Sequence, residues 1–174
     1  MKLKNLKLLG VILAFLFCFP LHFLYDKVPC FITSIISPVN ESIWEHMKIL
    51  FGSIILSGVI QKVIVKVSKL PYKNICISNF ICAVLSIIIF LILYIPIYIT
   101  LGEILPLTIF IMLIAIITVQ IISIYIVKYI NDLKMENLAI IFAIITYTLF
   151  GILTYNPIKM ELFKDPIKMD YGIK

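Results

Sequence analysis

The densest group of chemically active side chains in the sequence lies in the run V-N-E-S-I-W-E-H, residues 39–46. Its polar members are Asn40, Glu41, Ser42, Glu45 and His46. A helix turns about 100° per residue, so Glu41 and Glu45 share one stripe of its surface. Ser42 and His46 share the adjacent stripe. Carboxylates and an imidazole on one helix face can accept protons, hold a cation or bind an amine. All five residues are therefore candidate ligand-binding residues, and Glu45 and His46 are candidate catalytic bases.

A second histidine, His22, stands near the end of the first apolar run, two residues after Pro20. If the first two helices bring His22 to the depth of His46, two imidazoles and the carboxylate of Glu45 lie together. That set can hold a transition metal ion. It can equally form a proton relay or a general-base pair. His22 is therefore a further candidate ligand-binding residue, the metal candidates are His22, Glu45 and His46, and the identity of any cofactor is left open.

The same residue types also have structural uses. Glu41 in the first turn of a helix is favoured by the helix dipole alone. Glu45 and Lys48 are three residues apart and can form an ion pair. A histidine at the end of a membrane span is a common interfacial residue. The sequence therefore leaves a structural polar cap and a functional site open as alternatives.

The elements that must position these side chains follow from composition. The chain has 174 residues, of which 63% are apolar and 14% charged, and its mean hydropathy is +1.16. A soluble domain is about half apolar and about a quarter charged, and a membrane span takes roughly 20 residues. This excludes a soluble enzyme and a nucleic-acid-binding module. We expect an all-α, polytopic membrane helix bundle over residues 1–156, followed by a polar tail over 157–174. The five expected transmembrane helices lie at about residues 6–25, 41–66, 75–95, 104–128 and 138–155.

The distribution of lysines predicts the orientation of the bundle. All fifteen basic residues are lysines, and those at 2–7, 62–73 and 128–134 fall on one side of five spans. Positive loops stay in the cytoplasm, so the N-terminus is expected there and the C-terminus outside, in a bacterial cytoplasmic membrane. Both histidines and seven of the nine acidic residues then lie at the outer side. The expected partners are the lipid bilayer and a small ligand, not a nucleic acid.

Several segments together resemble a known family. These are H-F-L-Y at 22–25, V-N-E-S-I-W-E-H at 39–46, T-Y-N-P at 154–157, L-F-K-D-P at 162–166 and Y-G-I at 171–173. They are similar to the signature of a family of small bacterial integral membrane proteins classed as a domain of unknown function. The resemblance implies a membrane protein and supplies no reaction. It also implies that the tail packs against the second helix, which adds Asp165 and Tyr171 to the candidate ligand-binding residues.

The expected function is binding or transport of a small ligand or cation in an outward-facing Glu/His pocket. One alternative is a membrane-embedded hydrolase, with or without a metal, acting on a lipid or cell-wall precursor. A second alternative is a structural or immunity-type membrane protein. Whether the protein is an enzyme is left open.

Overall fold

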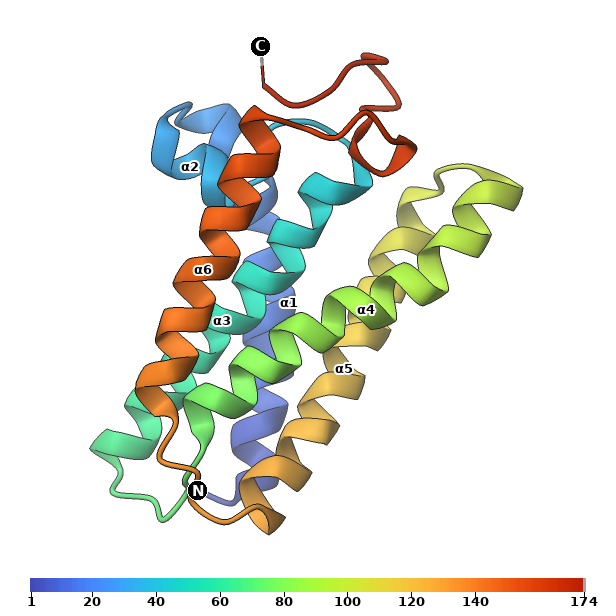
Figure 1. The fold of residues 1–174 in the computed structure, drawn as a ribbon. Coiled ribbons are helices and arrows are strands. Elements are labelled where there is room, and N and C mark those ends of the chain that lie inside the picture. The colour runs from blue at the N-terminus through green and yellow to red at the C-terminus, as the bar shows by residue number, and fades with distance from the viewer. Residues whose placement is uncertain (174) are drawn as a thin grey trace.

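The computed structural model describes residues 1–173 as a bundle of helices (Figure 1). The helices are α1 (Leu3–Lys27), α2 (Phe31–Ile36), α3 (Ile43–Val67), α4 (Ile75–Leu101), α5 (Leu105–Tyr129) and α6 (Glu136–Tyr155), followed by the 3-10 turn η1 (Glu161–Phe163). Within the described range there is no strand, only a single antiparallel bridge between Lys164 and Tyr171. The C-terminal tail lies across one end of the bundle, called here the tail end, and Met1 lies at the opposite end.

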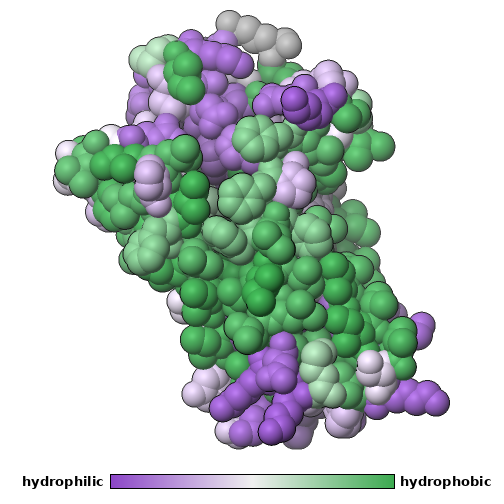
Figure 2. Space-filling view, turned by 180° about the vertical axis from the view of Figure 1, so that it is seen from behind, coloured by the Kyte–Doolittle hydropathy of each residue, from purple (hydrophilic) through white to green (hydrophobic). Residues whose placement is uncertain are grey.

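Five of these helices are long and apolar enough to cross a membrane, which confirms the expected all-α bundle of about five spans. Figure 2 shows why a bilayer suits the molecule: hydrophilic residues gather at both ends, and a hydrophobic band separates them. Many large apolar side chains in that band are exposed, among them Leu16, Ile92 and Ile144. Lipid is the solvent in which such exposure has no cost.

Helix α3 is the centre of the bundle. Over its most apolar stretch 61% of the residues are buried, against 17% in α1. Small residues let α4 approach it closely, because a Cβ atom added to Gly58 would lie only 2.7 Å from Asn79. Phe51 of α3 lies in the core and contacts the rings of Tyr147 and Phe150 on α6. The helix that carries residues 43–46 is therefore the most buried of the five long helices.

Two helix boundaries differ from the sequence-based expectation. The third span was expected to end at residue 95, before Pro96, but α4 continues through Pro96 to Leu101. A proline removes one backbone donor, and a membrane helix can re-satisfy the freed groups locally. The second span begins at Ile43 rather than residue 41, because Ser42 is its N-cap and its hydroxyl accepts a hydrogen bond from the Glu45 amide.

Lys7 is not the surface residue that the charge pattern suggests. Its side chain is only 1% exposed, at the opposite end of the bundle, and its ammonium donates to the Gln61 carbonyl oxygen at 2.7 Å. Two other lysines at that end form ion pairs nearer the surface, Lys62 with Glu136 and Lys73 with Asp132. Asp132 and Glu136 are the two acidic residues that the sequence places on the side away from the histidines, and both lie at that end.

The native cysteines give a direct test of orientation. Cys30 is exposed at the tail end, and hydrogen bonding to Thr33 lowers the pKa of its thiol, which favours the reactive thiolate. Cys18 and Cys82 are buried. If the tail end faces outward, a membrane-impermeant maleimide should label intact cells that make the wild-type protein and should not label the Cys30→Ser variant. Labelling only after permeabilisation would mean that the tail end faces the cytoplasm.

Candidate functional site

Three of the predicted side chains meet at the tail end. His22 lies in the last turns of α1, Glu41 in the loop before α3, and His46 in the first turn of α3. The Oε2 atom of Glu41 lies 3.4 Å from Nε2 of His46 and 3.9 Å from Nε2 of His22. One donor atom from each of the three residues lies within 4.8 Å of the other two. All three side chains are half-buried, so they are held by protein on one side and accessible on the other.

The orientation of His46 is fixed by the helix start. Its Nδ1 atom lies 2.9 Å from the carbonyl oxygen of Ser42. A carbonyl only accepts hydrogen bonds, so Nδ1 carries the proton and donates it. In the neutral ring Nε2 then keeps its lone pair, and Nε2 is the atom that faces Glu41. Histidine ligands of metal ions commonly have this arrangement, with the second ring nitrogen held by a carbonyl.

His22 is positioned by a residue that the sequence did not point out. The hydroxyl of Ser37 donates to the carbonyl of Leu21 at 2.5 Å and accepts from the amide of Tyr25 at 3.1 Å. It therefore joins the loop before α3 to the turn of α1 that carries His22. The imidazole stacks on Phe23 and meets the ring of His46 edge-on, with centroids 5.3 Å apart. Its Nδ1 atom is buried and has no hydrogen-bond partner among residues 1–173.

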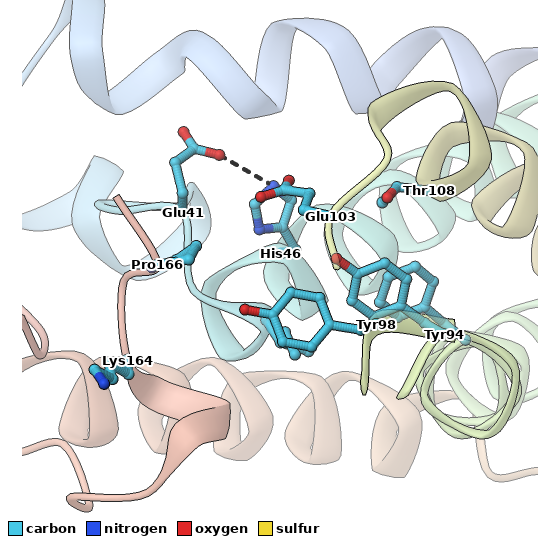
Figure 3. Close-up of a pocket in the computed structure, with 10 residues that line it drawn as sticks. Glu41, His46, Tyr94, Tyr98, Glu103, Thr108, Lys164 and Pro166 are labelled. Atoms are coloured by element: carbon cyan, nitrogen blue, oxygen red, sulfur yellow. Dashed lines mark ion pairs between the residues drawn. The ribbon is translucent and has the colours of Figure 1, made fainter. Parts of the chain in front are cut away.

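The three side chains border a cavity of about 230 Å³ between α1 and α5. The polar part of its lining consists of His22, Glu41, His46, Glu103 and Thr108. The remainder is lined mainly by Phe15, Phe19, Phe23, Ile49, Leu105, Ile109 and Met112. Figure 3 shows a neighbouring hollow that shares Glu41, His46, Glu103 and Thr108 with this cavity and is also lined by Tyr94 and Tyr98 of α4. The site is thus a polar cluster at one end of an apolar space.

Glu45 lies outside this cluster. It is 1% exposed, and its Oε2 atom accepts from the ammonium of Lys48 at 2.5 Å and from the amide of Val39 at 3.0 Å. Its Oε1 atom accepts from the hydroxyl of Thr154 at 2.8 Å. Both carboxylate oxygens of Glu45 are therefore bonded within the bundle. The carboxylate beside the two histidines belongs to Glu41, not to Glu45 as the sequence predicted. The ion pair of Glu45 and Lys48 is the structural alternative that the spacing allowed.

The tail packs against the start of α3, as the resemblance implied. The ring of Phe163 stacks on Trp44, with centroids 4.7 Å apart, and the amide of Asn40 donates to the carbonyl of Gly172 at 3.1 Å. Lys164 and Pro166 border the hollow beside Glu41 and His46. The tail therefore covers one side of the cluster.

The two tail candidates stay outside the cluster itself. Asp165 lines a separate cavity with Asn40, and its Oδ1 atom accepts from the amides of Ile167 and Lys168 in a tight turn. Tyr171 makes backbone contacts within the tail: it bridges to Lys164, and its amide donates to Asp170. Asn40 and Ser42 act on the loop, because the Oδ1 atom of Asn40 accepts from the amide of Ser42. These four residues shape the surroundings of the cluster.

Comparison with known proteins gives one match. Residues 1–173 match the model of a family described as "Family of unknown function (DUF6512)". The chain belongs to this family. No curated protein and no solved structure matches the DUF6512 chain. The match confirms the resemblance seen in the sequence, and its description names no reaction, so the chemistry of this DUF6512 protein has to be argued from its own residues.

Three residues near the cluster gave little sign in the sequence. Glu103 is an isolated carboxylate in a short turn, noticeable only as one of the acidic residues at that side of the membrane. Ser37 is an ordinary serine of the loop before α3, and only the fold shows that its hydroxyl bonds to α1. Thr154 is the first residue of the T-Y-N-P segment, but only the fold places its hydroxyl against Glu45.

The docked position of the tail predicts that replacing Gly172 will loosen the tail from the bundle. Gly172 has a φ of +64°, and a Cβ atom added there would lie 2.5 Å from the carbonyl oxygen of Thr154. We expect Gly172→Ala to cost about 1–2 kcal/mol of backbone strain and to speed tryptic cleavage of the tail roughly tenfold. Gly102→Ala is the matched control, because Gly102 has a φ of +72° and no atom within 4 Å of the added Cβ. Equal tail cleavage in both variants would contradict the docked tail.

Proposed function

We propose that this DUF6512 protein binds a divalent transition metal ion at the tail end, with zinc as the reference ion. The ligand atoms are Nε2 of His22, a carboxylate oxygen of Glu41 and Nε2 of His46. The proposal rests on one observation above all: three donor atoms from three separate elements lie within 4.8 Å of one another. Small side-chain rotations would bring the donors to the roughly 2 Å bond lengths that zinc prefers.

The chemistry of the donor set supports a transition metal over a harder cation. Imidazole nitrogens suit zinc, copper, iron and nickel, whereas calcium and magnesium prefer an all-oxygen shell. Two histidines and one glutamate also form the ligand set of several zinc enzymes, in which the fourth position is open to water or substrate. In this DUF6512 protein the cavity lies beside the cluster, so that fourth position has space.

A zinc titration of the purified protein tests the proposal. After chelator treatment and dialysis against zinc, the detergent-solubilised wild type should hold a stoichiometric amount of zinc by elemental analysis. Glu41→Gln keeps the shape of the side chain and removes its charge, and we expect zinc affinity to fall at least about 100-fold, because even outer-shell changes cost 10–100-fold.

The matched control is Glu161→Gln, which removes a carboxylate that is 83% exposed in the tail. It should leave zinc binding unchanged. If the wild type binds no zinc, or if both variants bind it as tightly as the wild type, the proposed site is wrong.

A further inference from the structure

The cavity beside the metal ligands has an amphiphilic lining. Its polar groups are gathered where His22, Glu41 and His46 meet, and Glu103 and Thr108 lie with them. The other lining residues are almost all aromatic or aliphatic, from α1, α3 and α5. A small hydrophilic ligand would leave this apolar part unfilled, at a cost in contact energy. A ligand with a polar head and a hydrocarbon chain would fill both parts.

The walls of the cavity also reach the lipid-facing surface. Phe19 and Phe23 on α1 are 46% and 53% exposed, and Leu105 on α5 is 60% exposed. These residues lie within spans that the composition places in the bilayer. A chain-bearing molecule in the adjacent leaflet could therefore enter sideways between α1 and α5 without crossing water.

The charge of the lining restricts the head group. Glu41 and Glu103 line the cavity, and within the described residues no lysine does. Two carboxylates and no lysine in the described lining disfavour a phosphate or sulfate head group. They suit a neutral or cationic head group.

We propose that the cavity holds an amphiphilic carboxylic ester with one hydrocarbon chain, drawn from the membrane, and that the protein hydrolyses it. This proposal rests on the metal site described above. The chain lies along Phe15, Phe19 and Ile109, and the ester group lies beside the histidines. Glu103 accepts the proton from the attacking water.

The reaction consumes only water. A metal ion held by His22, Glu41 and His46 would polarise the attacking water. As the oxygen of that water bonds to the carbonyl carbon, its proton passes to the carboxylate of Glu103. The bond from the carbonyl carbon to the alcohol oxygen then breaks, and Glu103 returns the proton to the departing alkoxide. The products are a carboxylic acid and an alcohol, and nothing is oxidised or reduced.

Chromogenic esters provide the test, with the zinc-loaded protein in lipid nanodiscs and nitrophenyl acetate and nitrophenyl dodecanoate as probes. Ile109→Trp fills the cavity, and Phe110→Trp places the same ring on the lipid side, where Phe110 is 58% exposed. We expect Ile109→Trp to lower the dodecanoyl-to-acetyl ratio of kcat/KM about tenfold, and Phe110→Trp to leave it unchanged. Comparing ratios between variants cancels the partitioning of the probes into lipid.

A separate variant tests Glu103 as the general base. Glu103→Gln should lower hydrolysis of both esters roughly 10²-fold, the usual effect of losing a general base, while zinc content stays stoichiometric. A zinc-loaded wild type with no hydrolysis above buffer, or an Ile109→Trp ratio equal to that of the wild type, overturns this inference and leaves the metal site standing. Absence of zinc from the wild type overturns both.

Discussion

Replacing Lys48 with methionine is expected to lower the free energy of unfolding by about 3–5 kcal/mol. The ammonium of Lys48 is 0% exposed and donates to Glu45 at 2.5 Å and to the carbonyl of Ser34 at 2.7 Å. Without it the carboxylate of Glu45 stays buried with no opposite charge. The loss also separates α2 from α3, because Lys48 is the side chain that holds the carbonyl of Ser34. Unfolding in mixed detergent micelles, followed by circular dichroism, measures the change.

The double variant Glu45→Gln, Lys48→Met separates charge burial from loss of packing. With both charges removed, no ion remains buried between α2, α3 and α6, and a neutral amide at 45 still accepts from Thr154. We therefore expect the double variant to regain a substantial part of the stability lost in Lys48→Met. A double variant as unstable as the single one would mean that the hydrogen bonds to α2, not the buried charge, determine stability there.

Zinc is expected to stabilise the folded protein strongly. At a free zinc concentration of about 100 times Kd, mass action adds roughly 2.7 kcal/mol to the stability. For a chain of this size that corresponds to an increase in Tm of roughly 5–10 °C, read from thermal unfolding in detergent. His46→Ala should abolish the increase, because it removes the imidazole whose Nε2 atom faces Glu41 at 3.4 Å.

A variant at the same end of the bundle serves as the control. Asp26→Asn removes an exposed acidic residue outside the cluster and should keep the full zinc-dependent shift. Equal shifts in His46→Ala and the wild type would show that zinc acts elsewhere, for example on the exposed thiol of Cys30. A Cys30→Ser background removes that possibility from the measurement.

The roles of Glu41 and Glu45 show how far residue spacing can be carried. Both lie on one stripe of an ideal helix, so residue spacing alone places their carboxylates side by side. The structure separates them because α3 begins only at Ile43, after the Ser42 cap. Glu41 is therefore in the loop and turns toward α1, whereas Glu45 is in the first turn and points toward Lys48 and α6. A shift of two residues in a helix start decided which carboxylate meets the histidines.

For the tail as well, the sequence predicted part of the arrangement and only the structure shows the rest. Its polar motifs predicted contact with the second helix, and Phe163 on Trp44 and Gly172 on Asn40 confirm that contact. The motifs did not predict that Asp165 would form a turn of its own beside a separate cavity. Local hydrogen bonds from a short acidic side chain compete with long-range contacts, and the sequence alone does not state the outcome.

The sequence by itself determined that this is a helical membrane protein with five spans, and that its histidines and most of its carboxylates lie at one end. The length of each apolar segment and the alternation of segments and loops are local properties of the sequence. In a bilayer each sufficiently long apolar segment forms a helical span, so these properties determine the number and order of the spans. Only the tertiary structure decided which of those polar groups touch. The α1–α3 packing brings His22 to His46, and the α4–α5 turn brings Glu103 to the same cavity. Such contacts depend on helix start, rotation and tilt, which are set by side-chain packing across the bundle rather than by any single segment.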